Sequence, residues 1–125
     1  MFEGLKVLYL EDEPLVAMDT GAHLQTLGFE TLEVAYKLAA AQELADRARF
    51  DLAILDINVD RGQTSIALGS ALKNAGTAVI FASGNGTMAN DLCRDGFEFL
   101  DKPFSLHALT AKLKQVVQDQ RISAV

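Results

Sequence analysis

The chain has 125 residues, half of them hydrophobic, so it is long enough for one domain with a packed core and leaves no room for a second folded module. Its 17 Asp and Glu outnumber its 11 Lys and Arg, and the formal net charge of −6 argues against nucleic-acid binding through phosphate contacts. The single cysteine, Cys93, excludes an internal disulfide and favours a reducing compartment. Since no apolar run approaches the ~18 residues of a membrane-spanning helix, we expect one cytoplasmic domain that occupies residues 1–125.

Short apolar segments alternate with stretches in which apolar residues recur every three or four positions. We predict strands at the apolar segments, which are residues 6–10, 31–34, 51–56, 78–82 and 97–100. We predict helices at the periodic stretches, which are residues 14–27, 38–48, 64–74, 87–95 and 106–120. The segments that end at Leu10, Asp56 and Ala82 are almost continuously apolar, as inner strands buried on both faces are. Residues 31–34 alternate only weakly, which is typical of an edge strand.

This alternation of strand and helix, repeated five times, indicates an α/β fold with a parallel sheet, right-handed crossovers and helices on both faces. The natural packing is a doubly wound, flavodoxin-like sheet of five strands in the order 2-1-3-4-5. Ligands of such sheets bind beyond the carboxyl ends of the strands, in the crevice between strands 1 and 3. The residues at those strand ends are therefore the candidates for a functional site.

Charged and hydroxyl side chains stand at four of the predicted strand ends. Glu11 and Asp12 follow the first strand, Asp56 ends the third, Ser83 follows the fourth and Lys102 follows the fifth. Carboxylates held together repel one another unless a cation neutralises them, and an open site of hard oxygen ligands favours Mg²⁺. Acids, a metal ion and a fixed cation together suit phosphoryl transfer, in which a carboxylate can serve as the nucleophile and become an acyl phosphate.

These residues resemble the CheY-like receiver domain of two-component response regulators. The resemblance covers residues 5–117 and rests on Glu11-Asp12, Asp56, Ser83-Gly84 and Lys102-Pro103-Phe104, in that order and at those strand ends. The motif Phe81-Ala82-Ser83-Gly84 also resembles a receiver subgroup with Phe-Ala-Thr-Gly at the fourth strand. The family implies a signalling domain of a phosphorelay, and not an enzyme beyond its own phosphorylation and dephosphorylation.

The resemblance assigns the chemistry to one carboxylate. It implies that Asp56 is the phosphoacceptor and that a histidine kinase or a phosphotransfer protein donates the phosphoryl group in a Mg²⁺-dependent reaction. Asp12 would bind the metal directly, and Glu11 would act mostly through water. The carboxylate of Asp56 and the backbone carbonyl of Asn58 would complete the protein ligands.

The resemblance also implies a conformational switch. We expect Ser83 to hydrogen-bond one phosphoryl oxygen and Lys102 to pair with another. We expect Phe99, three residues before the lysine, to change its packing in response. The coupled surface, residues 87–117, would contact a downstream partner that the sequence does not identify. The family further implies a cis peptide bond between Lys102 and Pro103.

Two alternatives stay open at the level of the sequence. An aspartyl-phosphate hydrolase needs a proton-exchanging acid two residues after its nucleophile, and Asn58 cannot take that role at neutral pH. A receiver-like binding module that is never phosphorylated stays open because the loop after Asp56 is unusual. Asp60 stands where many receivers have a proline, and we expect it to add an acid near the metal site, with Arg61 offsetting its charge.

Overall fold

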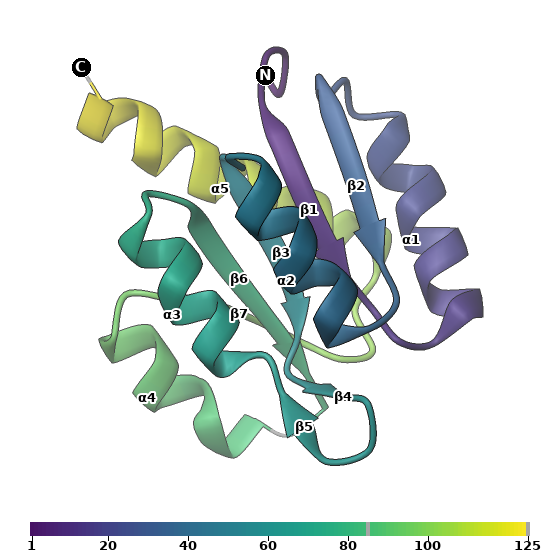
Figure 1. Ribbon diagram of the computed structural model, residues 1–125. Coiled ribbons are helices and arrows are strands. Elements are labelled where there is room, and N and C mark those ends of the chain that lie inside the picture. The colour runs from purple at the N-terminus through teal and green to yellow at the C-terminus, as the bar shows by residue number, and fades with distance from the viewer. Residues whose placement is uncertain (85, 125) are drawn as a thin grey trace.

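The computed structural model describes residues 1–84 and 86–124. Its main strands are β1 (Lys6–Leu10), β2 (Thr31–Ala35), β3 (Leu52–Asp56), β6 (Ala78–Ser83) and β7 (Glu98–Asp101). They form one parallel sheet in the order β2-β1-β3-β6-β7, which is the predicted doubly wound order (Figure 1). The helices are α1 (Pro14–Gln25), α2 (Leu38–Arg47), α3 (Ile66–Asn74), α4 (Ala89–Arg94) and α5 (Leu106–Ala124), and a 3-10 turn, η1 (Gly86–Met88), precedes α4. The predicted fold class is therefore confirmed.

Two hydrophobic clusters, one on each face of the sheet, hold the helices in place. Side chains alternate between the two faces along a strand, and in β1 Val7 and Tyr9 join one cluster whereas Leu8 and Leu10 join the other. The cluster around Val7 and Tyr9 includes buried residues of α1 and α5, and the cluster around Leu8 and Leu10 includes buried residues of α2, α3 and α4. All of β3 is buried, which explains why its apolar run is uninterrupted up to Asp56.

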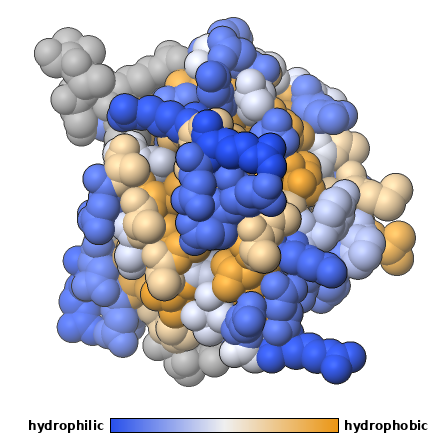
Figure 2. Space-filling view, in the orientation of Figure 1, coloured by the Kyte–Doolittle hydropathy of each residue, from blue (hydrophilic) through white to orange (hydrophobic). Residues whose placement is uncertain are grey.

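The helices form the outer layers and keep their polar sides in water. Hydrophilic side chains gather over α2 in Figure 2, where Gln42 hydrogen-bonds Asp46 at 3.0 Å and Arg47 pairs with Glu43. On the inner side of α2, Ala41 is completely buried against the sheet. Within the described part of the chain, no helix combines the length and the apolar character needed to cross a membrane.

The segment between β3 and α3 differs from the prediction. The sequence pattern predicted a helix from residue 64, but Gln63–Thr64 forms a short strand, β5, and α3 begins at Ile66. This strand pairs antiparallel with β4 (Asn58–Val59), which makes a hairpin at the carboxyl edge of the sheet (Figure 1). Val59 is only 1% exposed, so the hairpin is anchored in the core. Strands of two residues are too short to show a periodic pattern, and periodicity therefore did not reveal them.

Candidate functional site

The predicted site residues meet at the carboxyl edge of the sheet, toward which the arrowheads in Figure 1 point. Asp56 is the last residue of β3, and Ser83 is the last residue of the neighbouring strand β6. Glu11 and Asp12 directly follow β1, the neighbour of β3 on its other side. Lys102 directly follows β7. Because parallel strands end on the same edge, residues that are far apart in the sequence come together here.

Three carboxylates form a cluster at this edge. One oxygen each of Glu11, Asp12 and Asp56 lies within 4.8 Å of the others. Glu11 and Asp56 are buried, at 1% and 7% exposure, whereas Asp12 is partly exposed. Mg²⁺ prefers hard oxygen ligands, keeps several of its waters and needs few protein ligands, so a partly open set of carboxylates fits it. The donor set therefore suits the metal that the sequence predicted.

Lys102 supplies the fixed cation of the site. Its Nζ donates a hydrogen bond to Glu11 Oε1 at 2.7 Å and lies 3.5 Å from Asp56 Oδ2. Burial alone would lower the pKa of Lys102, but the hydrogen bond to Glu11 and the charge of Asp56 outweigh it and raise the pKa. Lys102 therefore stays charged and holds an ammonium group beside Asp56.

The environment of Asp56 favours its protonated form when no metal is bound. Burial and the nearby charge of Glu11 raise its pKa to about 7, although Lys102 acts in the opposite direction. Asp12 adds a smaller effect that also raises the pKa. A cation bound among these carboxylates would reverse the effect, because it favours their charged forms.

The backbone of Asp56 has a hydrogen-bond partner that the sequence analysis missed. Ser65, which is completely buried just before α3, donates its hydroxyl to the carbonyl oxygen of Asp56 at 2.8 Å. The sequence pattern placed Ser65 inside a helix that begins at residue 64, but α3 begins at Ile66, so Ser65 holds the position at which serine usually caps a helix. Here the side chain makes no capping hydrogen bond.

The loop residue Asp60 does not take the place that we expected. It is not part of the carboxylate cluster found among the described residues. Its Oδ2 instead accepts a hydrogen bond from the backbone N–H of Leu38, the first residue of α2, at 2.9 Å. The expectation of a further acid near the metal site is corrected accordingly. The free N–H groups at the start of a helix attract a carboxylate, which explains the difference.

The remaining predicted residues lie on β4, β6 and β7 and directly after β7. Ser83 is 2% exposed, and its carbonyl oxygen accepts a hydrogen bond from the backbone N–H of Lys102 at 3.0 Å. Phe99 of β7 is half-buried and packs against the hydrophobic cluster that lies between the sheet and the helices α2, α3 and α4. Asn58 begins β4 with an exposed side chain. The Lys102–Pro103 peptide bond is cis, as the resemblance implied.

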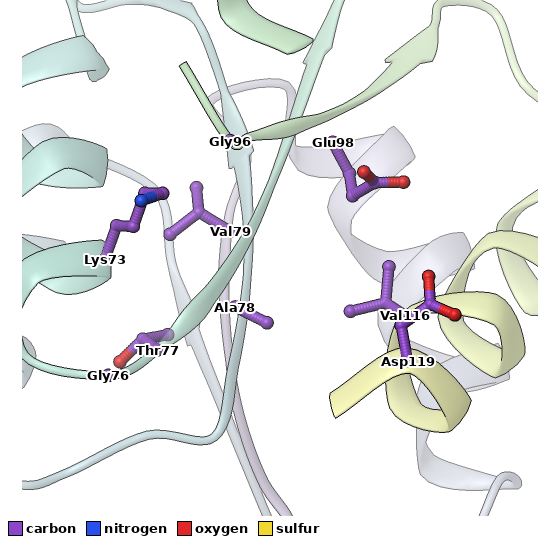
Figure 3. A pocket seen from close by; sticks show the side chains of 9 residues that line it. All are labelled: Lys73, Gly76, Thr77, Ala78, Val79, Gly96, Glu98, Val116 and Asp119. Carbon is purple, nitrogen blue, oxygen red and sulfur yellow. The ribbon is translucent and has the colours of Figure 1, made fainter. Parts of the chain in front are cut away.

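Two of the hollows among the described residues lie at opposite ends of the sheet. A groove of about 660 Å³ runs between the start of α1 and the segment that joins β7 to α5, and Lys102 lines it. The second hollow, of about 250 Å³, lies where β6 and β7 begin, with Lys73 on one side of β6 and Glu98 and Asp119 on the other (Figure 3). None of the predicted site residues lines the second hollow. The candidate site is therefore the carboxyl edge and its adjoining groove.

Comparison with known proteins gives matches along most of the chain. The family model of the response regulator receiver domain matches residues 7–114. The transcriptional regulatory protein CrdR of Helicobacter pylori is 32% identical over 123 residues, which cover 94% of this chain and 57% of that protein. The chain spans between 39% and 57% of the length of the curated relatives that it matches.

Solved structures share the fold at lower identity. A CheY-like receiver domain of Methanospirillum hungatei superposes with a TM-score of 0.82 at 21% identity, over 95% of this chain and 98% of that one. The response regulator TrrA of Thermotoga maritima, solved in complex with Mg²⁺-BeF, gives a TM-score of 0.77 at 22% identity, over 90% and 98% of the two chains. These structures have the same flavodoxin-like arrangement of a parallel sheet between helices.

Proposed function

The chain belongs to the family of response regulator receiver domains, and from this premise we propose that Asp56 accepts a phosphoryl group from a histidine kinase or a phosphotransfer protein. The proposed reaction depends on Mg²⁺ and leaves an acyl phosphate on Asp56. One observation carries the proposal: the Asp56 carboxylate lies both in an acidic cluster within 4.8 Å and 3.5 Å from the Lys102 ammonium. Phosphoryl transfer relies on this combination of positioning and charge neutralisation.

We assign the metal site to Asp12, Asp56 and the backbone carbonyl of Asn58, with Glu11 acting through water. Bound Mg²⁺ supplies positive charge that offsets the charge on the phosphoryl oxygens. The carboxylates hold the negative charge that attracts the cation. The Mg²⁺-BeF complex of the related TrrA fold supports the choice of metal.

Lys102 and Ser83 are proposed to bind the phosphoryl oxygens. Lys102 is held beside Asp56 by its 2.7 Å hydrogen bond to Glu11, so a phosphoryl group on Asp56 would lie within reach of the ammonium. Ser83 ends β6, the strand next to β3, and this position at the carboxyl edge supports the proposal that its hydroxyl binds another phosphoryl oxygen. Two donors of different charge would thereby hold separate oxygens.

We place the output of the switch at residues 87–117. In the pairing of β6 with β7, Phe99 lies opposite Phe81 and Asp101 lies opposite Ser83. Phe81 and Ser83 are two positions apart on β6, so their side chains lie on the same face of the sheet. A shift at Ser83 would therefore reach Phe99 through adjacent packing. We propose that the partner is a protein, because the net charge of −6 disfavours contact with phosphate backbones. We also propose that the domain, residues 1–125, acts in the cytoplasm, since the single cysteine favours a reducing compartment.

The proposal is tested by incubation with acetyl phosphate and Mg²⁺, followed by intact mass measurement. We expect a gain of one phosphoryl group that disappears with a chelator and in Asp56→Asn. The gain should persist in Asp95→Asn, a matched change of an exposed acid directly after α4. No gain with acetyl phosphate or with a histidine kinase would instead favour a binding module that is never phosphorylated. Sustained release of phosphate from varied phosphomonoesters would favour a hydrolase.

A further inference from the structure

The hairpin formed by residues 57–65 has two consecutive residues in left-handed backbone, which Asp60 tolerates and Arg61 does not favour. Asp60 and Arg61 have φ angles of 50° and 53°, in the left-handed region that residues with a Cβ rarely adopt. Such backbone persists only where the surrounding structure holds it, and it is concentrated near functional sites. Three hydrogen bonds hold it, one at the tip of the hairpin and two at its base.

The bond at the tip joins the hairpin to a different helix. Asp60 Oδ2 accepts the backbone N–H of Leu38 at 2.9 Å, so the carboxylate ties the hairpin to the start of α2. Leu38 lies 22 positions earlier in the chain, which makes this a tertiary contact and not a local turn. The tether fixes the hairpin two residues beyond Asn58.

The bonds at the base join the hairpin to the phosphoacceptor. The Ser65 hydroxyl donates to the carbonyl oxygen of Asp56 at 2.8 Å, and its backbone N–H donates to the carbonyl oxygen of Ile57 at 2.9 Å. Ser65 is completely buried, and it gives up the capping bond that a serine usually makes at the start of a helix. Both carbonyls that precede Asn58 therefore point toward Ser65.

We propose that residues 57–65 form a clamp that fixes the strand end for metal binding, with Asp60 and Ser65 as positioning residues. This inference rests on the proposed function, because Asn58, which lies between the two tethers, is the proposed source of the backbone metal ligand. Mg²⁺ demands near-ideal octahedral geometry, so small displacements of a backbone carbonyl weaken its binding. Neither positioning residue touches the metal; each acts through the backbone of Asp56, Ile57 and Asn58.

Four variants distinguish the effect of the two tethers from the effect of the strained backbone of the turn. Asp60→Gly keeps the positive φ accessible and removes the carboxylate, whereas Asp60→Asn keeps both a positive φ and an acceptor for Leu38. Ser65→Ala removes the hydroxyl without adding volume. Arg61→Gly is the matched control, because it relieves the strain of the same turn and leaves both tethers in place.

The measurement is the dissociation constant of Mg²⁺, obtained by calorimetric titration of the unphosphorylated proteins at a temperature at which circular dichroism shows each to be folded. We expect a rise of about tenfold in Asp60→Gly and in Ser65→Ala, as is common when groups that orient metal ligands are lost. We expect no change in Asp60→Asn and Arg61→Gly. Protection of the Leu38 amide from hydrogen exchange should fall in Asp60→Gly and persist in Asp60→Asn.

A dissociation constant that stays within twofold of the parental value in folded Asp60→Gly overturns the clamp, and so does an unchanged value in folded Ser65→Ala. If the buried Ser65→Ala variant does not fold, Asp60→Gly alone decides the matter. If the parental protein binds no Mg²⁺, the proposed function is contradicted, and the clamp inference is refuted as well because it depends on that function. The parental titration thus distinguishes the two failures.

Discussion

Removing the charge of Asp56 should stabilise the metal-free protein at alkaline pH. Burial and the neighbouring Glu11 raise the pKa of Asp56 from its ordinary value of 3.8 to about 7 in the folded protein. In the unfolded chain the Asp56 carboxyl has its ordinary pKa, so the folded state binds the proton more tightly than the unfolded state does. The stability contributed by this proton is complete below about pH 4 and is lost as the pH rises through about 7.

The size of the effect follows from this difference of about three pKa units. At about 1.4 kcal/mol per unit, ionised Asp56 costs the folded protein at most about 4 kcal/mol above pH 7. The variant Asp56→Asn removes the charge but places an amide donor near the Lys102 ammonium, which costs about 1–2 kcal/mol. We therefore expect Asp56→Asn to be more stable than the parental protein by about 2 kcal/mol at about pH 8, and to have no advantage at about pH 4.

Urea unfolding followed by circular dichroism, with a chelator present, measures this difference at both pH values. Added Mg²⁺ should stabilise the parental protein at alkaline pH and should stabilise Asp56→Asn less, because the variant has lost a metal ligand. Asp95→Asn, in which the original acid is exposed, keeps Asp56 and serves as the control, which should follow the parental protein at both pH values. If Asp56→Asn and the parental protein differ in stability by the same amount at both pH values, the reasoning is refuted. Only a proton that binds the folded state more tightly than the unfolded state makes this difference depend on pH.

Two further predictions concern the packing that supports the site. Gly69→Ala places a Cβ against the completely buried Phe81 ring, closer than side chains pack, so we expect the free energy of unfolding to fall by about 1–3 kcal/mol. An unchanged melting temperature would show that α3 shifts without cost. His23→Ala breaks the 2.7 Å hydrogen bond between His23 Nε2 and Thr110 Oγ1 that joins α1 to α5, with an expected loss of about 1 kcal/mol. Thr110→Val in the same background should add little, and fully additive losses would contradict a shared bond.

Much of the fold could be predicted from the sequence because its local patterns agree with its tertiary structure. The apolar run that ends at Asp56 predicted an inner strand, and all of β3 is buried. The weak alternation of residues 31–34 predicted an edge strand, and β2 lies at the edge of the sheet. Strand ends were predictable in turn, since a polar residue directly after a buried run marks the point where the chain leaves the core.

The predictions failed where long-range contacts outweigh local pattern. Residue 64 was expected in a helix, but antiparallel pairing with β4 keeps Gln63–Thr64 extended. Asp60 was expected near the metal site because of its charge and its position after β3. The start of α2, which lies close only in the folded chain, provides a better partner for the carboxylate. Ser65 was missed for the same reason, since nothing in the local sequence shows that its hydroxyl meets Asp56.

The central claim is that Asp56 is the residue that carries the phosphoryl group, and site mapping tests it most directly. The protein is phosphorylated with acetyl phosphate and Mg²⁺, reduced with borohydride, which converts an aspartyl phosphate to homoserine, and mapped by peptide mass spectrometry. The arrangement of Asp56 beside Lys102 and the other two carboxylates predicts homoserine at position 56 alone. Homoserine at position 12 or at any other aspartate, with Asp56 intact, would contradict the account.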